Sequence, residues 1–310
     1  MQFGAKCRLG AGRVKFPVDR GWRINQQLHR DLILLRPGRA TSLLPSPMSA
    51  DAEFETLAGC DLNAFCHALY HRQPKWVTGS ISYYDTRFLF KTALESGCRV
   101  AVEIGTAAGF STGVLCRALE MAGRLGRIPP DFQVVSYDIA RNFYADLTKR
   151  VGDAAREELS AELLEHVVFK NPATALDVRK DYAESGVDLL FIDANHQHPW
   201  PTLDLLATLD VLRPGATVLF HDINLPVLYP EFADWGVHHL VNDPCMEMQL
   251  PLDTDNPDLP NICSIRIPAE KEPLRAALVK LLAAHPWHAT IEDSFLAKLG
   301  MVRPDAPAVK

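Results

Sequence analysis

The chain has 310 residues, of which 47% are hydrophobic and 23% are charged, and these are ordinary proportions for a globular protein. Its seven cysteines are scattered without a CxxC pair, which argues against a disulfide framework or a structural zinc site and favours a reducing, cytoplasmic location. No apolar run approaches the roughly 18 to 20 residues that cross a bilayer, so we expect no membrane insertion.

Positive charge is concentrated in residues 1–47. This segment has nine Lys or Arg residues against two Asp, a net charge of +7, whereas the rest of the chain has a net charge of −13. The acidic remainder argues against nucleic-acid binding. Three interpretations of the basic segment stay open: a disordered extension, translation from upstream of a true start at Met48, or an organelle transit peptide. We predict a single domain over residues 48–310.

Two helices are predicted before the first strand. Residues 51–72 place Phe54, Leu57 and Leu62 among apolar positions that recur at mostly three- to five-residue intervals. A second helix is predicted over residues 84–96, and it ends at Gly97, a residue type that is common just past a helix C-terminus.

Short apolar runs then alternate with helical stretches. The predicted strands are residues 99–105, 133–138, 166–170, 187–193 and 216–222. This alternation predicts right-handed βαβ crossovers, hence a doubly wound, Rossmann-like α/β sheet. Two further candidates, 236–242 and 261–267, lack a convincing helix between them and are expected to pair antiparallel at the edge. The predicted fold is a mostly parallel seven-stranded sheet with N-terminal accessory helices.

Four of the five predicted parallel strands have an acid within a residue or two of their end. These acids are Glu103, Asp138, Asp193 and Asp222. Ligands of open α/β sheets bind outside the carboxyl ends of the strands, so we expect a functional site along this edge.

A glycine-containing turn, "VEIGTAAGFSTGVL", joins the first strand to its helix. Gly105 and Gly109 permit a tight turn, and the following helix N-terminus offers free N–H groups to an anion. The spacing is GxxxG, so the dinucleotide fingerprint GxGxxG is absent. A tight structural connection is the alternative reading of this turn. Asp138, at the end of the second strand, is placed to accept hydrogen bonds from both hydroxyls of a ribose.

Four segments together resemble a known family. "VEIGTAAGFST", "VVSYDIA", "DLLFIDANH" and "VLRPGATVLFHDIN" are similar to successive motifs of class I S-adenosylmethionine-dependent O-methyltransferases, especially the catechol-type and natural-product sugar methyltransferases. The resemblance covers roughly residues 84–268. Asp138 follows Gly105 by 33 positions, which is longer than usual and indicates a longer surface turn.

The resemblance implies a set of residues for S-adenosyl-L-methionine. Glu103, Gly105 and Gly109 would shape the methionine pocket, Ser111 would lie near the ligand's carboxylate, and Asp138 would hold the ribose. The implied cofactor set is Glu103, Gly105, Thr106, Gly109, Ser111, Asp138 and Asp193.

Asp193 and Asp222 are predicted to share one divalent cation, since oxygen ligands favour Mg²⁺, Mn²⁺ or Ca²⁺, with Mg²⁺ the expected ion. Such a cation lowers the pKa of a coordinated hydroxyl, and His196 is expected to accept the acceptor's proton as a general base. Metal-dependent relatives have an acid followed by Asn after the next strand, whereas this chain has His221 and Asp222. His221 is taken as the third ligand, with Asn224 as an alternative.

Other polar residues have simpler interpretations. His198 is expected to cap or pack at a helix start, and His238 and His239 to alternate across an edge strand. Asp193 and His196 could also do no more than bond loop backbone. A zinc hydrolase built on His196, His198 and His221 is disfavoured, because no recognised zinc-ligand spacing accompanies them.

The leading hypothesis is a metal-dependent O-methyltransferase that acts on a small hydroxylated molecule, a sugar or another natural product. The alternatives are a nicotinamide-dependent oxidoreductase, which GxxxG and the absence of a YxxxK pair disfavour, and a non-catalytic cofactor-binding module that serves a partner interface. Tyr83, Tyr84 and Trp200 are candidates for the acceptor pocket. The acceptor's identity and the oligomeric state, including a homo-oligomer, stay open.

Overall fold

The computed structural model describes residues 61–182, 186–224, 236–243, 246–251, 261–287 and 289–303, together with two short antiparallel strands near the N-terminus, β1 (Lys6–Leu9) and β2 (Gly12–Lys15). Apart from this strand pair, the basic segment 1–47 lies outside the described residues, as do the first ten positions of the helix predicted over 51–72. The proposed boundary at Met48 therefore stays a prediction.

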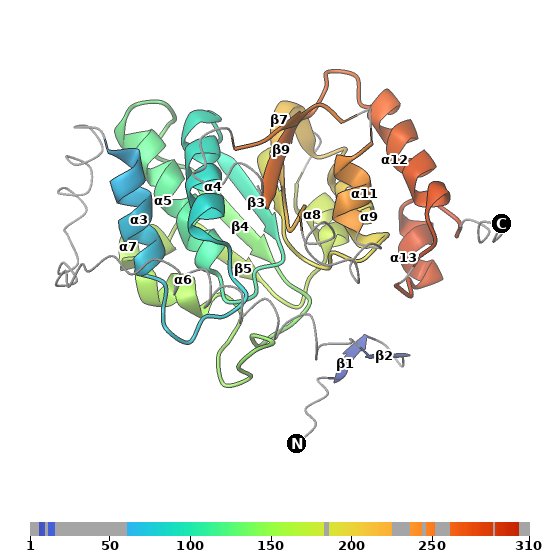
Figure 1. Ribbon diagram of the computed structural model, residues 1–310, viewed down its shortest axis with the longest axis horizontal. Coiled ribbons are helices and arrows are strands. Elements are labelled where there is room, and N and C mark those ends of the chain that lie inside the picture. The colour runs from blue at the N-terminus through green and yellow to red at the C-terminus, as the bar shows by residue number, and fades with distance from the viewer. Residues whose placement is uncertain are drawn as a thin grey trace.

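The centre of the molecule is one seven-stranded sheet with the order β5-β4-β3-β6-β7-β9-β8 (Figure 1). Its strands are β3 (Val100–Ile104), β4 (Gln133–Tyr137), β5 (Val167–Lys170), β6 (Val187–Ile192), β7 (Leu212–His221), β8 (Met248–Gln249) and β9 (Ile262–Arg266). Neighbours from β5 to β7 are parallel, whereas β9 is antiparallel to both β7 and β8. The prediction of a Rossmann-like, mostly parallel sheet with an antiparallel edge is confirmed.

Helices cover both faces of the sheet (Figure 1). One face packs against α3 (Leu62–His71), α4 (Tyr83–Glu95), α5 (Phe110–Arg124), α6 (Asp153–Glu158) and α7 (Ala161–Leu164). The other packs against α8 (Ala175–Asp181), α9 (Trp200–Thr208), α11 (Gly236–Val241), α12 (Glu272–Ala284) and α13 (Asp293–Lys298). Successive strand residues point to opposite faces, so Ala101 joins one core cluster and Val102 the other. Burial on both faces explains the nearly continuous apolar character of the strands.

The interpretation of residues 236–242 as an edge strand was wrong, because this segment forms helix α11. Val237, Leu240 and Val241 are all buried, and their spacing of three and four positions is helical rather than alternating. The edge partner of β9 is instead β8, which lies between the two segments predicted as strands. The strand predicted over 261–267 is confirmed as β9.

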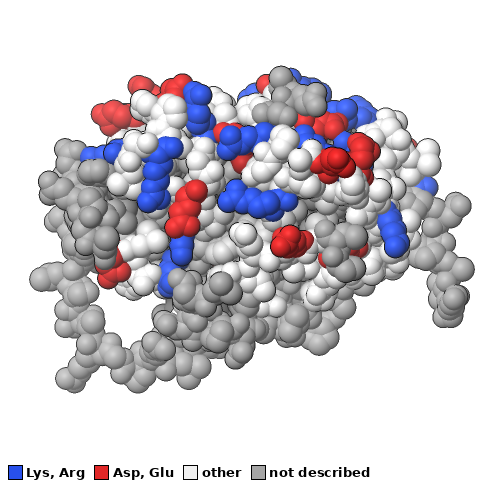
Figure 2. Space-filling model, turned by 90° about the horizontal axis from the view of Figure 1, so that it is seen from above, with Lys and Arg blue, Asp and Glu red and all other residues white. Residues whose placement is uncertain are grey.

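The surface is of mixed charge on the face shown in Figure 2, where basic and acidic side chains are interspersed. Among the described helices, none combines the length and apolar character needed to cross a membrane.

Candidate active site at the carboxyl ends of the strands

The parallel strands bring their carboxyl ends to one edge of the sheet. Residues that follow β3 and β4 therefore meet residues that follow β6 and β7, although 88 positions separate Gly105 from Asp193. Asp193 N–H donates to the Ile104 carbonyl at 2.9 Å, and Gly105 N–H donates to the Tyr137 carbonyl at 2.8 Å. These two bonds fix where the loops leave the sheet.

Glycine is required at two positions of the loop after β3. Gly105 has φ +101°, and a Cβ there would lie 2.3 Å from the carbonyl oxygen of Asp193. Gly109 has φ +89°, and a Cβ there would lie 2.6 Å from Cα of Gly152. Only glycine combines these φ values with such close backbone approach. Gly105 thus lets the loop pass directly against the end of β6, and Gly109 lets it pass against the backbone before α6.

Glu103 lies beneath this loop and is fully buried. Its carboxylate accepts hydrogen bonds from the hydroxyls of Ser111 (2.5 Å), Thr112 and Ser136. Burial raises the pKa of Glu103 to about 7, although the three hydroxyls act in the opposite direction. The hydroxyl of Thr106 makes a 2.6 Å hydrogen bond with that of Ser136. The structure therefore places Glu103, Thr106 and Ser111 in one hydroxyl–carboxylate network that supports the loop.

Asp138 follows β4 and connects it to the same loop. Its Oδ2 accepts from Ala107 N–H at 2.9 Å, and its Oδ1 accepts from Ala140 N–H at 2.7 Å. Ala107 itself has φ +45°, an uncommon conformation for a residue with a Cβ. Burial raises the pKa of Asp138 and backbone hydrogen bonds lower it, with burial the larger effect. Each carboxylate oxygen has further lone pairs for a ligand's hydroxyl groups.

A small cleft of about 20 Å³, partly open to solvent, lies over the glycine loop. Gly105, Thr106, Gly109, Ser111 and Asp193, all predicted from the sequence to contact the cofactor, are among its lining residues. The opposite wall is the segment 78–81 with Phe143, and these were not predicted. The sequence "TGSI" before α4 has no periodic pattern, and only its glycine indicates a turn.

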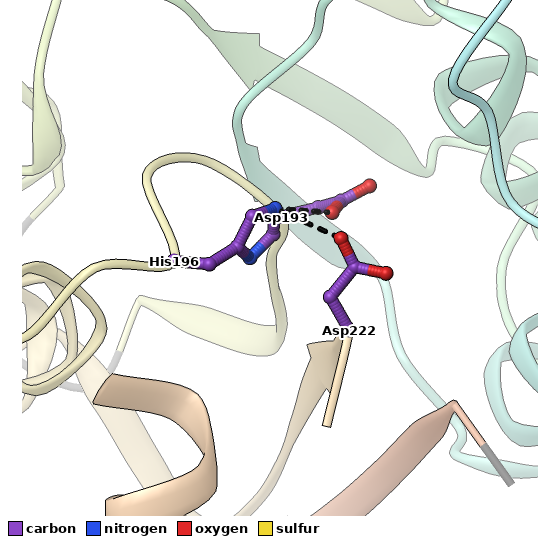
Figure 3. A group of neighbouring side chains, drawn as sticks. All are labelled: Asp193, His196 and Asp222. Carbon is purple, nitrogen blue, oxygen red and sulfur yellow. Dashed lines mark ion pairs between the residues drawn. The ribbon is translucent and has the colours of Figure 1, made fainter. Parts of the chain in front are cut away.

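Asp193, His196 and Asp222 form a second group at this edge, called here the carboxylate–imidazole cluster (Figure 3). Nε2 of His196 lies 3.2 Å from Oδ2 of Asp222 and 3.7 Å from Oδ1 of Asp193. One ligand atom from each residue lies within 4.8 Å of the other two. Atoms that bind one cation at about 2.0 to 2.6 Å are at most about 5 Å apart, so the cluster fits a divalent ion.

His221 lies behind the cluster and is buried. Its Nδ1 lies 3.1 Å from Oδ1 of Asp193 and 3.4 Å from Oδ1 of Asp222, and its Nε2 lies 3.3 Å from Oδ2 of Asp85. Burial lowers the pKa of His221, but the carboxylates around it raise it more, so the pKa lies well above its usual value. Both ring nitrogens therefore face carboxylates. His196 joins Asp193 and Asp222 in the carboxylate–imidazole cluster, and the assignment of His221 as the third ligand stays a prediction.

Two further residues at this edge were not predicted. Asp85, in the first turn of α4, contacts His221 as described, and Asn261, just before β9, donates from Nδ2 to Oδ1 of Asp222 at 2.7 Å. Asn224, the alternative third ligand, donates its backbone N–H to Oδ1 of Asn261 at 3.2 Å. Residues 82–85, "SYYD", which end at Asp85, do match a helix capping box. A capping box alone, however, does not indicate a functional site.

The remaining candidates are placed by packing contacts. His198 is fully buried and makes edge-to-face ring contacts with His239 and His285, as expected for a packing residue. Trp200 packs edge-to-face against Phe295. Tyr83 makes an edge-to-face contact with Tyr70 of α3. Neither aromatic residue lines the cleft over the glycine loop.

Residues 102–223 match a family model described as a methyltransferase domain. This range begins in β3, ends just after β7 and contains the glycine loop and the whole carboxylate–imidazole cluster. The prediction of a methyltransferase enzyme is confirmed. No curated protein matches the sequence.

Solved structures with a similar fold include several methyltransferases. The O-methyltransferase TomG from Streptomyces achromogenes, in complex with SAM, is 22% identical, with 70% of this chain and 96% of that chain covered and a TM-score of 0.46. The O-methyltransferase from Bacillus cereus, in complex with SAH, is 19% identical, with coverage of 79% and 98% and a TM-score of 0.45. A methyltransferase from Geobacter sulfurreducens is 16% identical, with coverage of 79% and 97% and a TM-score of 0.44.

Proposed function

We propose, from the premise that residues 102–223 form a methyltransferase domain, that the chain transfers a methyl group from S-adenosylmethionine to a hydroxyl of a small molecule with the help of a divalent cation. One observation carries this proposal: Asp193 lines the cleft over the glycine loop and also belongs to the carboxylate–imidazole cluster. A cofactor in the cleft and a hydroxyl at the cluster would therefore be neighbours.

The cleft suits the charges of S-adenosylmethionine. Free N–H groups at the start of α5 favour the ligand's carboxylate, while Asp193 favours its amino group and sulfonium. Asp138 would accept hydrogen bonds from the two ribose hydroxyls with the lone pairs that the loop leaves available. No GxGxxG fingerprint accompanies these residues, so a nicotinamide dinucleotide has less support than S-adenosylmethionine.

The cluster would hold the cation through Asp193, Asp222 and His196, and its carboxylates favour Mg²⁺ or Mn²⁺. A divalent ion supplies Lewis-acid chemistry, since it lowers the pKa of a coordinated hydroxyl and so favours the nucleophilic alkoxide. His221 would hold the two carboxylates in place through Nδ1, and Asn261 would fix Oδ1 of Asp222.

His196 has a second candidate role as the general base predicted from the sequence. Its side chain is 18% exposed and its Nε2 lies 3.2 Å from Oδ2 of Asp222, so Nε2 could instead accept a proton from a hydroxyl held beside Asp222. Calorimetric titration of His196→Gln with Mn²⁺ separates the two roles. A large loss of Mn²⁺ affinity supports the ligand role, whereas unchanged affinity with slow methyl transfer supports the base.

The function is tested with the full chain and methyl-labelled S-adenosylmethionine. Binding is measured by calorimetry, and transfer is measured against a panel of catechols, free sugars and sugar nucleotides with Mg²⁺, with Mn²⁺ or with a chelator. We expect saturable binding and metal-stimulated transfer to at least one hydroxylated acceptor. Absence of binding would overturn the cofactor assignment, and transfer that a chelator leaves unchanged would overturn the role of the cation.

The substrate class within this panel is proposed to be sugars or sugar-bearing natural products. The support is the His221-Asp222 pair, which resembles metal-dependent sugar methyltransferases more than the catechol-type enzymes. Transfer to catechols at a rate above that of every sugar would contradict this choice.

A further inference from the structure

Asp85 is an almost completely buried acid in the first turn of α4. Its Oδ2 accepts from the backbone N–H of Ser82 at 3.0 Å and from the Ser82 hydroxyl at 2.6 Å. The same oxygen lies 3.3 Å from Nε2 of His221, a residue 136 positions later in the chain. Asp85 therefore joins the N-terminal helices to the end of β7.

The His221 imidazole bridges Asp85 and the carboxylate–imidazole cluster. While Nε2 faces Asp85, Nδ1 faces Oδ1 of both Asp193 and Asp222. The ring also contacts the edge of Phe191 with a centroid separation of 6.4 Å. A ring that rotated away from Asp85 would turn Nδ1 away from the cluster, because the two nitrogens are fixed in one plane.

Helix capping does not account for this arrangement. The capping box of α8 uses the same chemistry, since Asp177 accepts from the backbone N–H of Thr174 at 2.8 Å. Asp177 is only partly buried, however, and its other oxygen pairs with Lys180 at the surface. Burial of a carboxylate has a desolvation cost that a cap does not require. Asp85 has this burial and a histidine partner in addition to the cap.

We propose that Asp85 is a positioning residue that holds His221 so that its Nδ1 orients the carboxylates of Asp193 and Asp222 for the cation. This inference rests on the proposed function, because it assumes that the two carboxylates bind a divalent ion. Partners of this kind around metal ligands contribute through orientation and are a recurrent part of metal sites.

The test is calorimetric titration of the full chain with Mn²⁺ alone, with no methyl acceptor. We expect Asp85→Ala to weaken Mn²⁺ binding by about 10- to 100-fold, and Asp85→Asn by less because its amide oxygen still accepts from Nε2. The matched control, Asp177→Asn, removes the corresponding capping interaction of α8 without touching Asp85 or His221 and should leave Mn²⁺ affinity within about twofold. S-adenosylhomocysteine affinity checks that every variant keeps the cleft.

Equal Mn²⁺ affinities in the Asp85 variants and the Asp177→Asn control would overturn the positioning role. If Asp85→Ala does not fold, Asp85→Asn decides the question by the same comparison. If the wild-type chain binds no Mn²⁺, the proposed cation is wrong, and the imidazole resonances of His221, assigned by their loss in His221→Gln, then test the inference separately. A shift of these resonances in Asp85→Asn but not in Asp177→Asn supports the contact, and no shift overturns it.

Discussion

The two sides of the strand-end edge differ in how their carboxylates are stabilised. On the β3–β4 side, Glu103 accepts from three hydroxyls and Asp138 from two backbone N–H groups, all supplied by the chain. On the β6–β7 side, Asp193 and Asp222 face each other, the imidazoles of His196 and His221, and the amide of Asn261.

The two sides thus use their carboxylates in different ways. Carboxylates that neutral donors satisfy can build a rigid loop without any added charge, as Glu103 and Asp138 do. Two carboxylates that lie close together repel each other and are stabilised by a positive charge, from imidazolium or from a bound cation. The carboxylates of the first side are stabilised by neutral donors of the chain, whereas those of the second are stabilised by imidazoles and, in the function proposed above, by a bound cation.

Gly105 lies where the two sides touch, and its substitution has the largest expected effect. Gly105→Ala would place a Cβ 2.3 Å from the backbone oxygen of Asp193 at φ +101°, so we expect a loss of about 3 kcal/mol or more in unfolding free energy and loss of cofactor binding. Gly126→Ala is the matched control, because Gly126 has φ +69° and nothing within 4 Å, and it should cost only about 1 kcal/mol. Urea denaturation measures both, and equal losses would contradict the close approach.

Asp193→Asn should strongly weaken the binding of a divalent cation to the carboxylate–imidazole cluster. The substitution keeps the shape but takes away one of two anionic ligands, so Mn²⁺ affinity should fall more than about 100-fold, beyond the 10- to 100-fold loss typical of residues behind the ligands. Asp188→Asn is the control at the opposite end of β6, where Asp188 accepts from the N–H groups of Arg99 and Val100. Calorimetry that finds similar Mn²⁺ affinity in both variants would show that the cluster does not bind the ion.

The sequence predicted the fold well, and it placed Glu103 and Asp138 at the strand ends, because both results depend on local patterns. Apolar runs of strand length, the GxxxG turn and the acid at the end of four of the five parallel strands are readable without knowing any contact. Residues 236–242 were misread because a short apolar run fits either period, and only Val237, Leu240 and Val241 packing on the core decides for a helix.

Contacts between distant segments were beyond the reach of sequence patterns. The approach of Asp85 to His221 joins α4 to β7, and that of Asn261 to Asp222 crosses from β9, with no periodic signal in either case. The positions of His196 and His221 were equally out of reach: spacing put both at the edge, but only side-chain direction places His196 in the cluster and His221 between the cluster and Asp85.

Glu103, on the β3–β4 side, should make the unfolding free energy of the chain depend on pH. Because burial raises the pKa of Glu103 to about 7 from its ordinary value of 4.5, the folded chain keeps a proton that the unfolded chain loses between these values, so wild-type stability falls as pH rises through this window. Glu103→Gln cannot lose that proton. Its stability relative to wild type should therefore improve by about 2 to 3 kcal/mol between pH 5 and pH 8.

Urea denaturation at the two pH values measures the effect of Glu103→Gln. Glu165→Gln, at an exposed position, is the control and should show no such change. A Glu103→Gln difference that is flat with pH would mean that the three hydroxyls keep the buried carboxylate ionised throughout.

Asp138→Ala tests whether the first side also binds the ribose. Loss of charge-assisted hydrogen bonds to two hydroxyls should weaken S-adenosylhomocysteine binding by about 1 to 3 kcal/mol. The Asp188→Ala control removes another carboxylate that accepts from two backbone N–H groups, at the end of the sheet away from the cleft. If calorimetry shows no greater loss for Asp138→Ala than for Asp188→Ala, Asp138 only supports the loop.

Removal of residues 1–47 should have the smallest effect on both sides. The two buried core clusters are built from residues between Phe65 and Leu296, so a chain of residues 48–310 keeps every described core contact, and its unfolding free energy should change by less than about 0.5 kcal/mol. Removal of residues 1–72 is the control, since it also deletes α3 with the buried Phe65, Cys66 and Leu69, and should cost several kcal/mol. If removal of residues 1–47 alone lowers stability or S-adenosylhomocysteine affinity as much as removal of residues 1–72 does, the loss comes from the basic segment and not from α3. The basic segment would then be part of the folded domain.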